Sequence, residues 1–242
     1  MKTTLHRAEK WIKKGKYQKA LSLLLEMLRE NDDAHLYYLA GESYRLDGNT
    51  EEAISMLQKA VIRREDSAPY WLTLGIAYYS ANYFVRAVEA LGKAKKYDPE
   101  EIEVYRHLGV VYQKVGNHKK SLQWYKRAKE MHWHKVMQQI DDGLLEAKYK
   151  KKSRQAMVHM IPVDKYYAAL KKDAVFSVLN NEIGMALMSL GRYEEALENL
   201  KKAIEFIPEQ YDYYDPYRNF YEASRQCKAR RKSDTEEERK HY

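Results

Sequence analysis

Three glycines recur at intervals of 34 residues within stretches whose apolar residues have helical spacing: Gly41, Gly75 and Gly109. A glycine inside a helix costs about 1 kcal/mol relative to alanine, so its repeated use indicates positions where a side chain would collide with a neighbour. Aromatic residues precede each glycine at a fixed offset (Tyr37, Trp71, Tyr105), and tyrosines follow it at another (Tyr44, Tyr78, Tyr112). This fixed interval predicts tandem copies of one small structural unit.

The pattern continues beyond each glycine through a turn and a second apolar stretch. The shared positions are Gly48, Asn82 and Gly116 at the turn, then Ala53, Ala87 and Ser121, then Leu57, Leu91 and Tyr125, then Ala60, Ala94 and Ala128. Pro99 ends one copy. Two helical stretches joined by a turn predict an antiparallel helix pair, in which small residues such as Gly75 and Ala94 allow close contact.

This pattern resembles the tetratricopeptide repeat (TPR), a helix–turn–helix unit of 34 residues, and residues 68–101 match it most fully. Residues 1–33 match through Trp11, Gly15, Tyr17, Ala20 and Leu24, and residues 177–210 match through Gly184, Gly191, Tyr193, Ala196, Leu200, Ala203 and Pro208. The resemblance implies an all-α fold, a right-handed α-solenoid of tandem helix–turn–helix repeats with a C-terminal capping helix.

We expect a single solenoid over residues 1–230. Its repeats are expected at about 1–33, 34–67, 68–101, 102–135, a degenerate repeat at 136–176 with a basic insertion, and 177–210, followed by a cap helix at 211–230. The highly charged tail, 231–242, is expected to be disordered.

The repeat at 136–176 is the least regular, because it has 41 residues where 34 are expected. Gly143 takes the position of the helix glycine counted forward from 136. Tyr166 and Ala169 fit the second helix counted back from 177. The seven additional residues then form a basic loop within residues 148–157.

In TPR arrays the first helix of each repeat lines a concave groove, with lining positions three or four residues apart. The resemblance therefore implies a partner-binding set. The set is Tyr38, Glu42, Arg45, Leu72, Ile76, Tyr79, Arg106, Val110, Gln113, Lys114, Leu144, Met185 and Met188, with Ile140 and Asn181 beside them. Its centre is apolar, and Arg45, Arg106 and Lys114 would orient acidic groups of a partner.

The function that follows is a non-enzymatic adaptor or scaffold, which binds an amphipathic helix or an extended, acidic peptide of another protein. The same apolar strip could instead be covered by the chain's own C-terminal helix or by a second copy of the chain, which would make the protein a self-associating scaffold subunit.

A second function remains open because the chain carries a formal net charge of +8. One basic run comprises Lys148, Lys150, Lys151, Lys152 and Arg154. Clustered cations bind phosphate groups through counterion release, so this loop could serve a nucleic-acid- or ribosome-associated module. A solvated, charged loop is the simpler interpretation.

Catalysis, cofactors and export are not expected. The sequence has no phosphate-binding glycine loop, zinc-protease motif or nucleophile elbow. His132 and His134 lie two positions apart, on different faces of a helix, so they do not predict a metal site. A single cysteine, Cys227, the absence of a long apolar run and the absence of an apolar signal core after Met1 predict a soluble, cytoplasmic protein.

Overall fold

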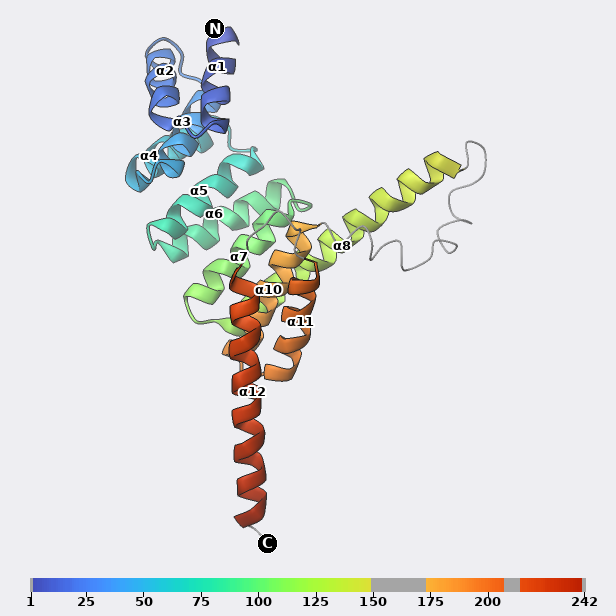
Figure 1. Cartoon of the computed structure of the whole chain (residues 1–242). Helices are drawn as coiled ribbons and strands as arrows, with labels where there is room; N and C mark the ends of the chain where they lie inside the picture. Colours follow the sequence, from blue (N-terminus) through green and yellow to red (C-terminus); the bar gives the residue numbers. More distant parts are fainter. Residues whose placement is uncertain (1, 149–172, 207–213, 241–242) are drawn as a thin grey trace. The chain divides into compact units, whose positions relative to one another are not determined.

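The computed structural model describes residues 2–148, 173–206 and 214–240, and the secondary structure of these residues is helical (Figure 1). The helices are α1 (Lys2–Lys13), α2 (Tyr17–Glu30), α3 (Ala34–Leu46), α4 (Thr50–Arg63), α5 (Ala68–Ser80), α6 (Phe84–Tyr97), α7 (Ile102–Lys114), α8 (His118–Lys148), α10 (Ala174–Ser189), α11 (Tyr193–Glu205) and α12 (Tyr214–Lys240). The all-α class with helices paired in tandem is confirmed. None of the described helices is long and apolar enough to cross a lipid bilayer.

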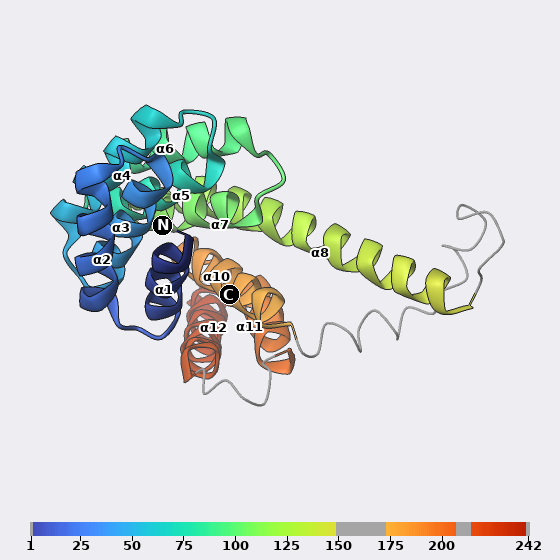
Figure 2. The same ribbon diagram turned by 90° about the horizontal axis from the view of Figure 1, so that it is seen from above.

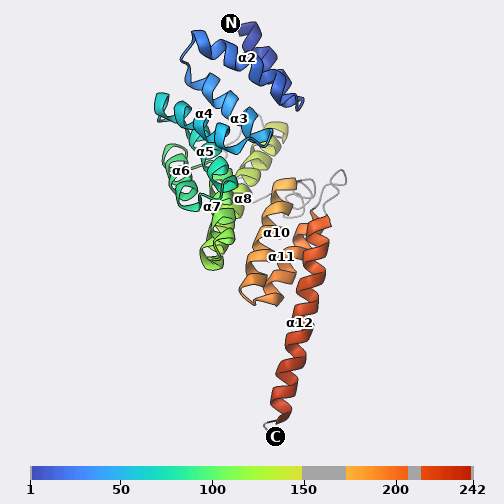
Figure 3. The ribbon, with the colours of Figure 1, turned by 90° about the vertical axis from the view of Figure 1, so that its left-hand side faces the viewer.

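The chain forms two compact units, unit 1 (residues 1–111) and unit 2 (residues 112–242). Unit 1 contains the hairpins α1–α2, α3–α4 and α5–α6 and most of α7. The hairpins pack in chain order, since α2 contacts α3 and α4 contacts α5 (Figure 3).

Three hairpins, α3–α4, α5–α6 and α10–α11, depend on a close approach at a helix glycine. A Cβ atom added to Gly75 would lie 2.8 Å from Cγ of Leu91 and 3.4 Å from the backbone oxygen of Ala87. The arrangement recurs between Gly41 and Leu57, at 2.6 Å, and between Gly184 and Leu200, at 2.5 Å. The steric explanation is therefore confirmed for Gly41, Gly75 and Gly184, and the residue that fills the space opposite Gly75 is Leu91.

The turn within each hairpin requires a left-handed backbone. Gly48 has φ of 88° and Asn82 has φ of 61°, a region that glycine and asparagine adopt at the lowest cost. After α5, the amide of Tyr83 donates to the carbonyl of Tyr78 at 2.8 Å, which closes the end of the helix. The predicted turns are thus confirmed.

The small and leucine positions of the second helices form the core between hairpins. Side chains at these positions are fully buried: Ala20, Ala53, Ala87, Ala196, Leu24, Leu57, Leu91, Leu200, Ala60, Ala94, Ala128 and Ala203. Ser121 replaces alanine in one repeat and is buried in the same way. Large-to-small changes at the leucine positions cost about 2–5 kcal/mol, and larger side chains at the alanine positions would overpack the core. The repeat pattern therefore specifies the packing.

Unit 2 contains α8, α10, α11 and α12 together with the last residues of α7. Helix α10 packs against α8 and α11, and α12 packs against α11 and α10 (Figure 2). Asp173 caps α10, because its side chain accepts hydrogen bonds from the amides of Val175 and Phe176. The α10–α11 hairpin corresponds to the predicted repeat at 177–210.

Two features of unit 2 differ from the sequence prediction. Helix α8 runs without a break from His118 to Lys148, so there is no helix end at the predicted boundary between 135 and 136. The stretch from 118 to 142 lacks the glycine and proline that end the helices of the other repeats, and lysine, glutamine, leucine and methionine continue a helix readily. The predicted second helix of this repeat, with Tyr166 and Ala169, lies outside the described residues.

The second feature concerns the charged tail, residues 231–242. Helix α12 begins at Tyr214, close to the predicted cap, and continues to Lys240. Residues 231–240 are thus part of α12. Their glutamate, lysine and arginine residues favour helix, and no glycine or proline interrupts them.

Candidate functional site

Three first helices of unit 1, α3, α5 and α7, carry a row of half-buried side chains that we call the first-helix face. Its members are Tyr38, Glu42, Arg45, Leu72, Ile76, Tyr79, Arg106 and Val110. Helix α3 contacts α5, and Arg45 on α3 is close enough to His107 on α7 to influence its charge. Eight members of the predicted partner-binding set thus lie on adjacent helices of one unit.

The centre of the first-helix face is an apolar strip on α5. Leu72 and Ile76 are four residues apart, and Tyr79 follows three residues later, so all three lie on one side of the helix. Each is half-buried rather than buried, whereas Leu74, on the other side of α5, is 2% exposed. The strip therefore retains apolar surface that a partner could cover.

Tyr38 forms a rigid edge of the first-helix face. Its ring stacks on that of Tyr70, with centroids 4.7 Å apart and planes inclined by 18°. Burial, then the charge of Glu42, raises the pKa of the Tyr38 phenol, against a hydrogen bond with Thr73. The hydroxyl is consequently a neutral donor and acceptor at physiological pH.

The two arginines of the first-helix face differ in how their charge is compensated. Arg106 donates to Oε2 of Glu103 at 2.8 Å, so its charge is already paired. Within the described residues, no carboxylate forms an ion pair with Arg45, whereas Arg106 is paired with Glu103. Arg45 is therefore the better placed of the two to bind an incoming carboxylate.

His107 on α7 lies beside these arginines. Its Nε2 is 3.1 Å from a terminal nitrogen of Arg106 and 3.6 Å from Oε2 of Glu103. Arginine can only donate, so Nε2 accepts and the ring is neutral. Burial, then the charge of Arg106, lowers the pKa of His107 to about 4, against the opposing effect of Glu103.

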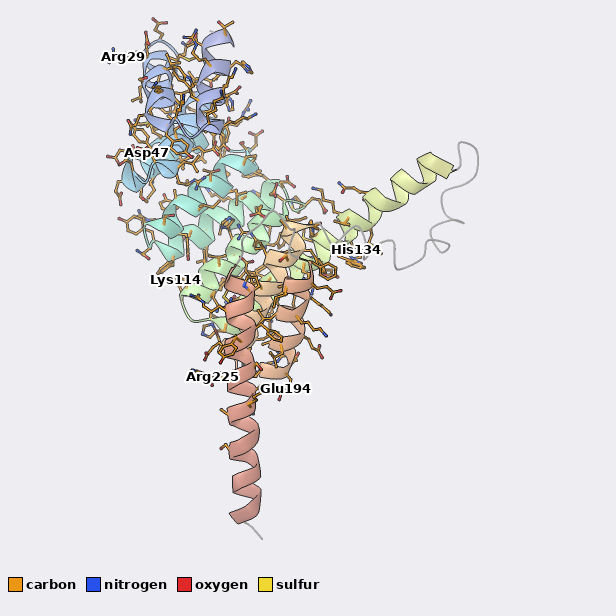
Figure 4. The ribbon with its side chains drawn as sticks, in the orientation of Figure 1. Arg29, Asp47, Lys114, His134, Glu194 and Arg225 are labelled. Carbon is orange, nitrogen blue, oxygen red and sulfur yellow. The ribbon has the colours of Figure 1, made fainter. Side chains whose placement is uncertain are left out.

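The remaining predicted members belong to unit 2. Gln113 donates to Oγ of Ser189 at 3.2 Å, and Lys114 is exposed at the end of α7 (Figure 4). Met185 and Met188 are half-buried on α10. The neighbouring Asn181 accepts a hydrogen bond from Asn219 of α12 at 3.0 Å, so the C-terminal helix contacts the first helix of this hairpin.

Other predicted residues cannot be placed with their side chains. Leu144 lies in α8 and Lys148 ends it, but their side chains are outside the described residues. The rest of the basic run, Lys150, Lys151, Lys152 and Arg154, is outside them as well. The alternative function at this loop stays a prediction.

Unit 2 also contains a pocket that the sequence did not predict, and its lining residues come from three parts of the chain. It lies between α8, α10 and α11 and has a volume of about 360 Å³. In the same unit, Nε2 of His132 lies 2.7 Å from a carboxylate oxygen of Asp173, the capping residue of α10. His132 therefore joins two helices. His134 is exposed.

Comparison with known proteins identifies the class. Two tetratricopeptide repeat models match the chain, one over residues 12–69 and 72–134 and the other over residues 178–210. The chain belongs to the tetratricopeptide repeat family, as the sequence pattern predicted.

Individual relatives are distant. The BBSome complex member BBS4 of Bos taurus is 24% identical over 82% of this chain. The photosystem I assembly protein Ycf3 of Synechococcus is 30% identical over 38% of this chain. This chain spans 37% of the length of the first and 56% of the second.

A solved structure supports the same fold. MamA from Desulfovibrio magneticus is similar with a TM-score of 0.62 and 15% identity, over 85% of this chain and 93% of that one. At this identity the similarity shows the fold alone.

Proposed function

We propose that the protein is a non-enzymatic adaptor that binds a segment of another protein along the first-helix face of unit 1. The observation that carries the proposal is the accessible apolar strip of Leu72, Ile76 and Tyr79 beside Arg45. Apolar side chains of the partner would cover the strip, and an acidic side chain would accept a hydrogen bond from Arg45. Binding of this kind depends on a few anchor residues.

The family and its relatives support this proposal. Protein binding is typical of TPR repeats, which are generally non-catalytic. The two relatives are named for a multiprotein complex, the BBSome, and for the assembly of another, photosystem I.

Unit 1 is the better candidate of the two units for this function. In unit 2 the first helix α10 already contacts α12, through Asn181 and Asn219. This contact is of the kind expected if the chain's own C-terminal helix, rather than a partner, covers first-helix positions. Among the predicted positions whose side chains the structure describes, the apolar strip on α5 has three half-buried members and α10 has two, Met185 and Met188.

Replacing Leu72 and Ile76 by glutamate is expected to reduce partner capture at least about tenfold, because buried, unpaired carboxylates are costly at an interface. The measurement is quantitative mass spectrometry of proteins retained by the immobilised variant and by the wild type from a lysate of the source organism.

A matched control places the same charges on the second helices. Ile62 on α4 and Val85 on α6 are 78% and 74% exposed, and the variant Ile62→Glu plus Val85→Glu is expected to retain the partners. If both double variants keep the partners of the wild type, with unchanged helicity, the first-helix face is not the binding site.

A further inference from the structure

The pocket in unit 2 combines an aromatic floor with a cationic rim. Trp133, Phe176 and Phe206 form the floor, and Lys126, Lys129 and Lys202 lie around it. The rings of Trp133 and Phe176 are 6.1 Å apart, and those of Phe176 and Phe206 meet edge to face at 5.1 Å. Phe176 and Phe206 are buried, so the floor is fixed by packing.

Lys129 is the central cation of this pocket. Its ammonium donates to Oδ1 of Asn180 at 2.5 Å and to Oδ1 of Asn199 at 3.4 Å. It also lies 5.3 Å from the centre of the Phe176 ring. These partners are neutral, so they orient the ammonium without compensating its charge.

The charges around Lys129 leave the pocket with an excess of positive charge. Burial, then the nearby Lys202 and Lys126, lowers the pKa of Lys129 to about 8. Among the described residues, no carboxylate forms an ion pair with Lys129. The carboxylate that lines the pocket, Glu130, instead pairs with Arg127 at 3.0 Å.

We propose that this pocket is a second binding site, which takes a carboxylate together with an adjoining apolar side chain of a partner polypeptide. The volume of about 360 Å³ lies at the lower end of the range for ligand pockets. The apolar side chain would cover the half-buried ring of Trp133, the member of the aromatic floor that keeps exposed surface. The carboxylate would accept a charge-assisted hydrogen bond from Lys129 and offset the repulsion among the three ammonium groups.

This site is independent of the first-helix face. It lies in unit 2 and is built from α8, α10 and α11, whereas the first-helix face lies on α3, α5 and α7 of unit 1. An experiment that rules out binding at one of these two sites therefore does not rule out binding at the other.

The test uses small probes that carry the proposed chemistry. N-acetylphenylalanine has an aromatic side chain beside a terminal carboxylate, and N-acetylphenylalaninamide is its neutral match. Titration of the full-length, isotope-labelled protein, followed by NMR, is expected to shift signals of the pocket residues with a Kd of about 1 mM for the acid. The amide is expected to bind at least tenfold more weakly.

A third probe distinguishes the source of the carboxylate. N-acetyl-aspartyl-phenylalaninamide carries the charge on a side chain instead of a chain end. If it binds more tightly than N-acetylphenylalanine, the partner segment is internal; if it binds more weakly, the partner presents its C-terminus. Either result supports the proposed chemistry, provided that the shifts map to the pocket.

Lys129→Met keeps most of the aliphatic length and removes the charge. This variant is expected to lose most of the tenfold preference for the acid, since only Lys126 and Lys202 remain. Lys201→Met, at an exposed position on the same α11 that carries Lys202, is expected to keep the tenfold preference. The preference of the wild type is also expected to fall as pH rises through 8, because Lys129 then loses its proton.

The proposal is overturned if the acid and the amide bind equally well, if Lys129→Met keeps the preference, or if neither probe shifts pocket signals at concentrations about ten times the expected Kd.

Discussion

Replacing Gly75 by alanine is expected to lower the free energy of unfolding by about 2–3 kcal/mol, because it overpacks the contact between α5 and α6. The new Cβ atom would lie 2.8 Å from Cγ of Leu91. Leu91 is 0% exposed, so its side chain has no solvent-facing space into which it could move. Urea unfolding followed by circular dichroism measures the effect.

Gly92 provides the matched control in the same hairpin. It lies in α6, and no heavy atom is within 4 Å of the position that its Cβ would take. Gly92→Ala is therefore expected to raise the free energy of unfolding by about 0.5–1 kcal/mol, through helix propensity alone. Equal effects of the two substitutions would contradict the close-approach explanation.

The second large effect is a pH dependence that arises from His107. Its folded-state pKa is about 4, below the ordinary value of 6.5. Between these two values the unfolded chain binds the proton and the folded chain does not, so stability falls as pH falls. At about 1.4 kcal/mol for each pKa unit, this residue alone is expected to remove about 2 kcal/mol between pH 7 and pH 5.

His107→Gln isolates this effect, since the glutamine amide oxygen can accept from Arg106 but does not titrate. The variant is expected to lose about 2 kcal/mol less stability than the wild type between pH 7 and pH 5. His6, whose side chain is 81% exposed, supplies the control His6→Gln, which keeps the wild-type loss. If all three proteins lose stability equally, the ring of His107 is not held neutral by its surroundings.

The repeat fold could be predicted from the sequence because each of its marker residues has one structural role, either a close helix contact or a left-handed turn. Gly75 and the left-handed Asn82 both stand at fixed positions within a 34-residue interval, so their roles follow from the pattern. The half-buried positions of the first-helix face follow from the same interval, since Leu72 and Ile76 occupy one side of a helix whose other side is core.

The charge state of the first-helix face could not be predicted in the same way. Arg106 was expected to bind a partner's acidic group, but Glu103, one helical turn earlier, already pairs with it. Such pairing depends on rotamers that spacing alone does not select. The neutral state of His107 likewise depends on burial and on Arg45 from another helix.

The irregular part of the chain was the least predictable. The repeat frame is lost after residue 135, where no glycine or proline marks a helix end, and α8 continues instead. The pocket of unit 2 combines Lys129 and Trp133 from α8 with Phe176 from α10 and Phe206 just beyond α11. The residues on α8 are separated from Phe176 and Phe206 by the irregular segment, so the 34-residue interval does not relate their positions.

The central claim, that the first-helix face binds the partner, is tested most directly by site-specific photocrosslinking. A photoreactive phenylalanine analogue at Tyr79, on the first helix of the third hairpin, is compared with the same analogue at Val85, on the second helix of that hairpin. We predict that the partner crosslinks at position 79 and not at position 85. Crosslinking at 85 alone, with none at 79, would show that the partner binds the second-helix side and would contradict the account.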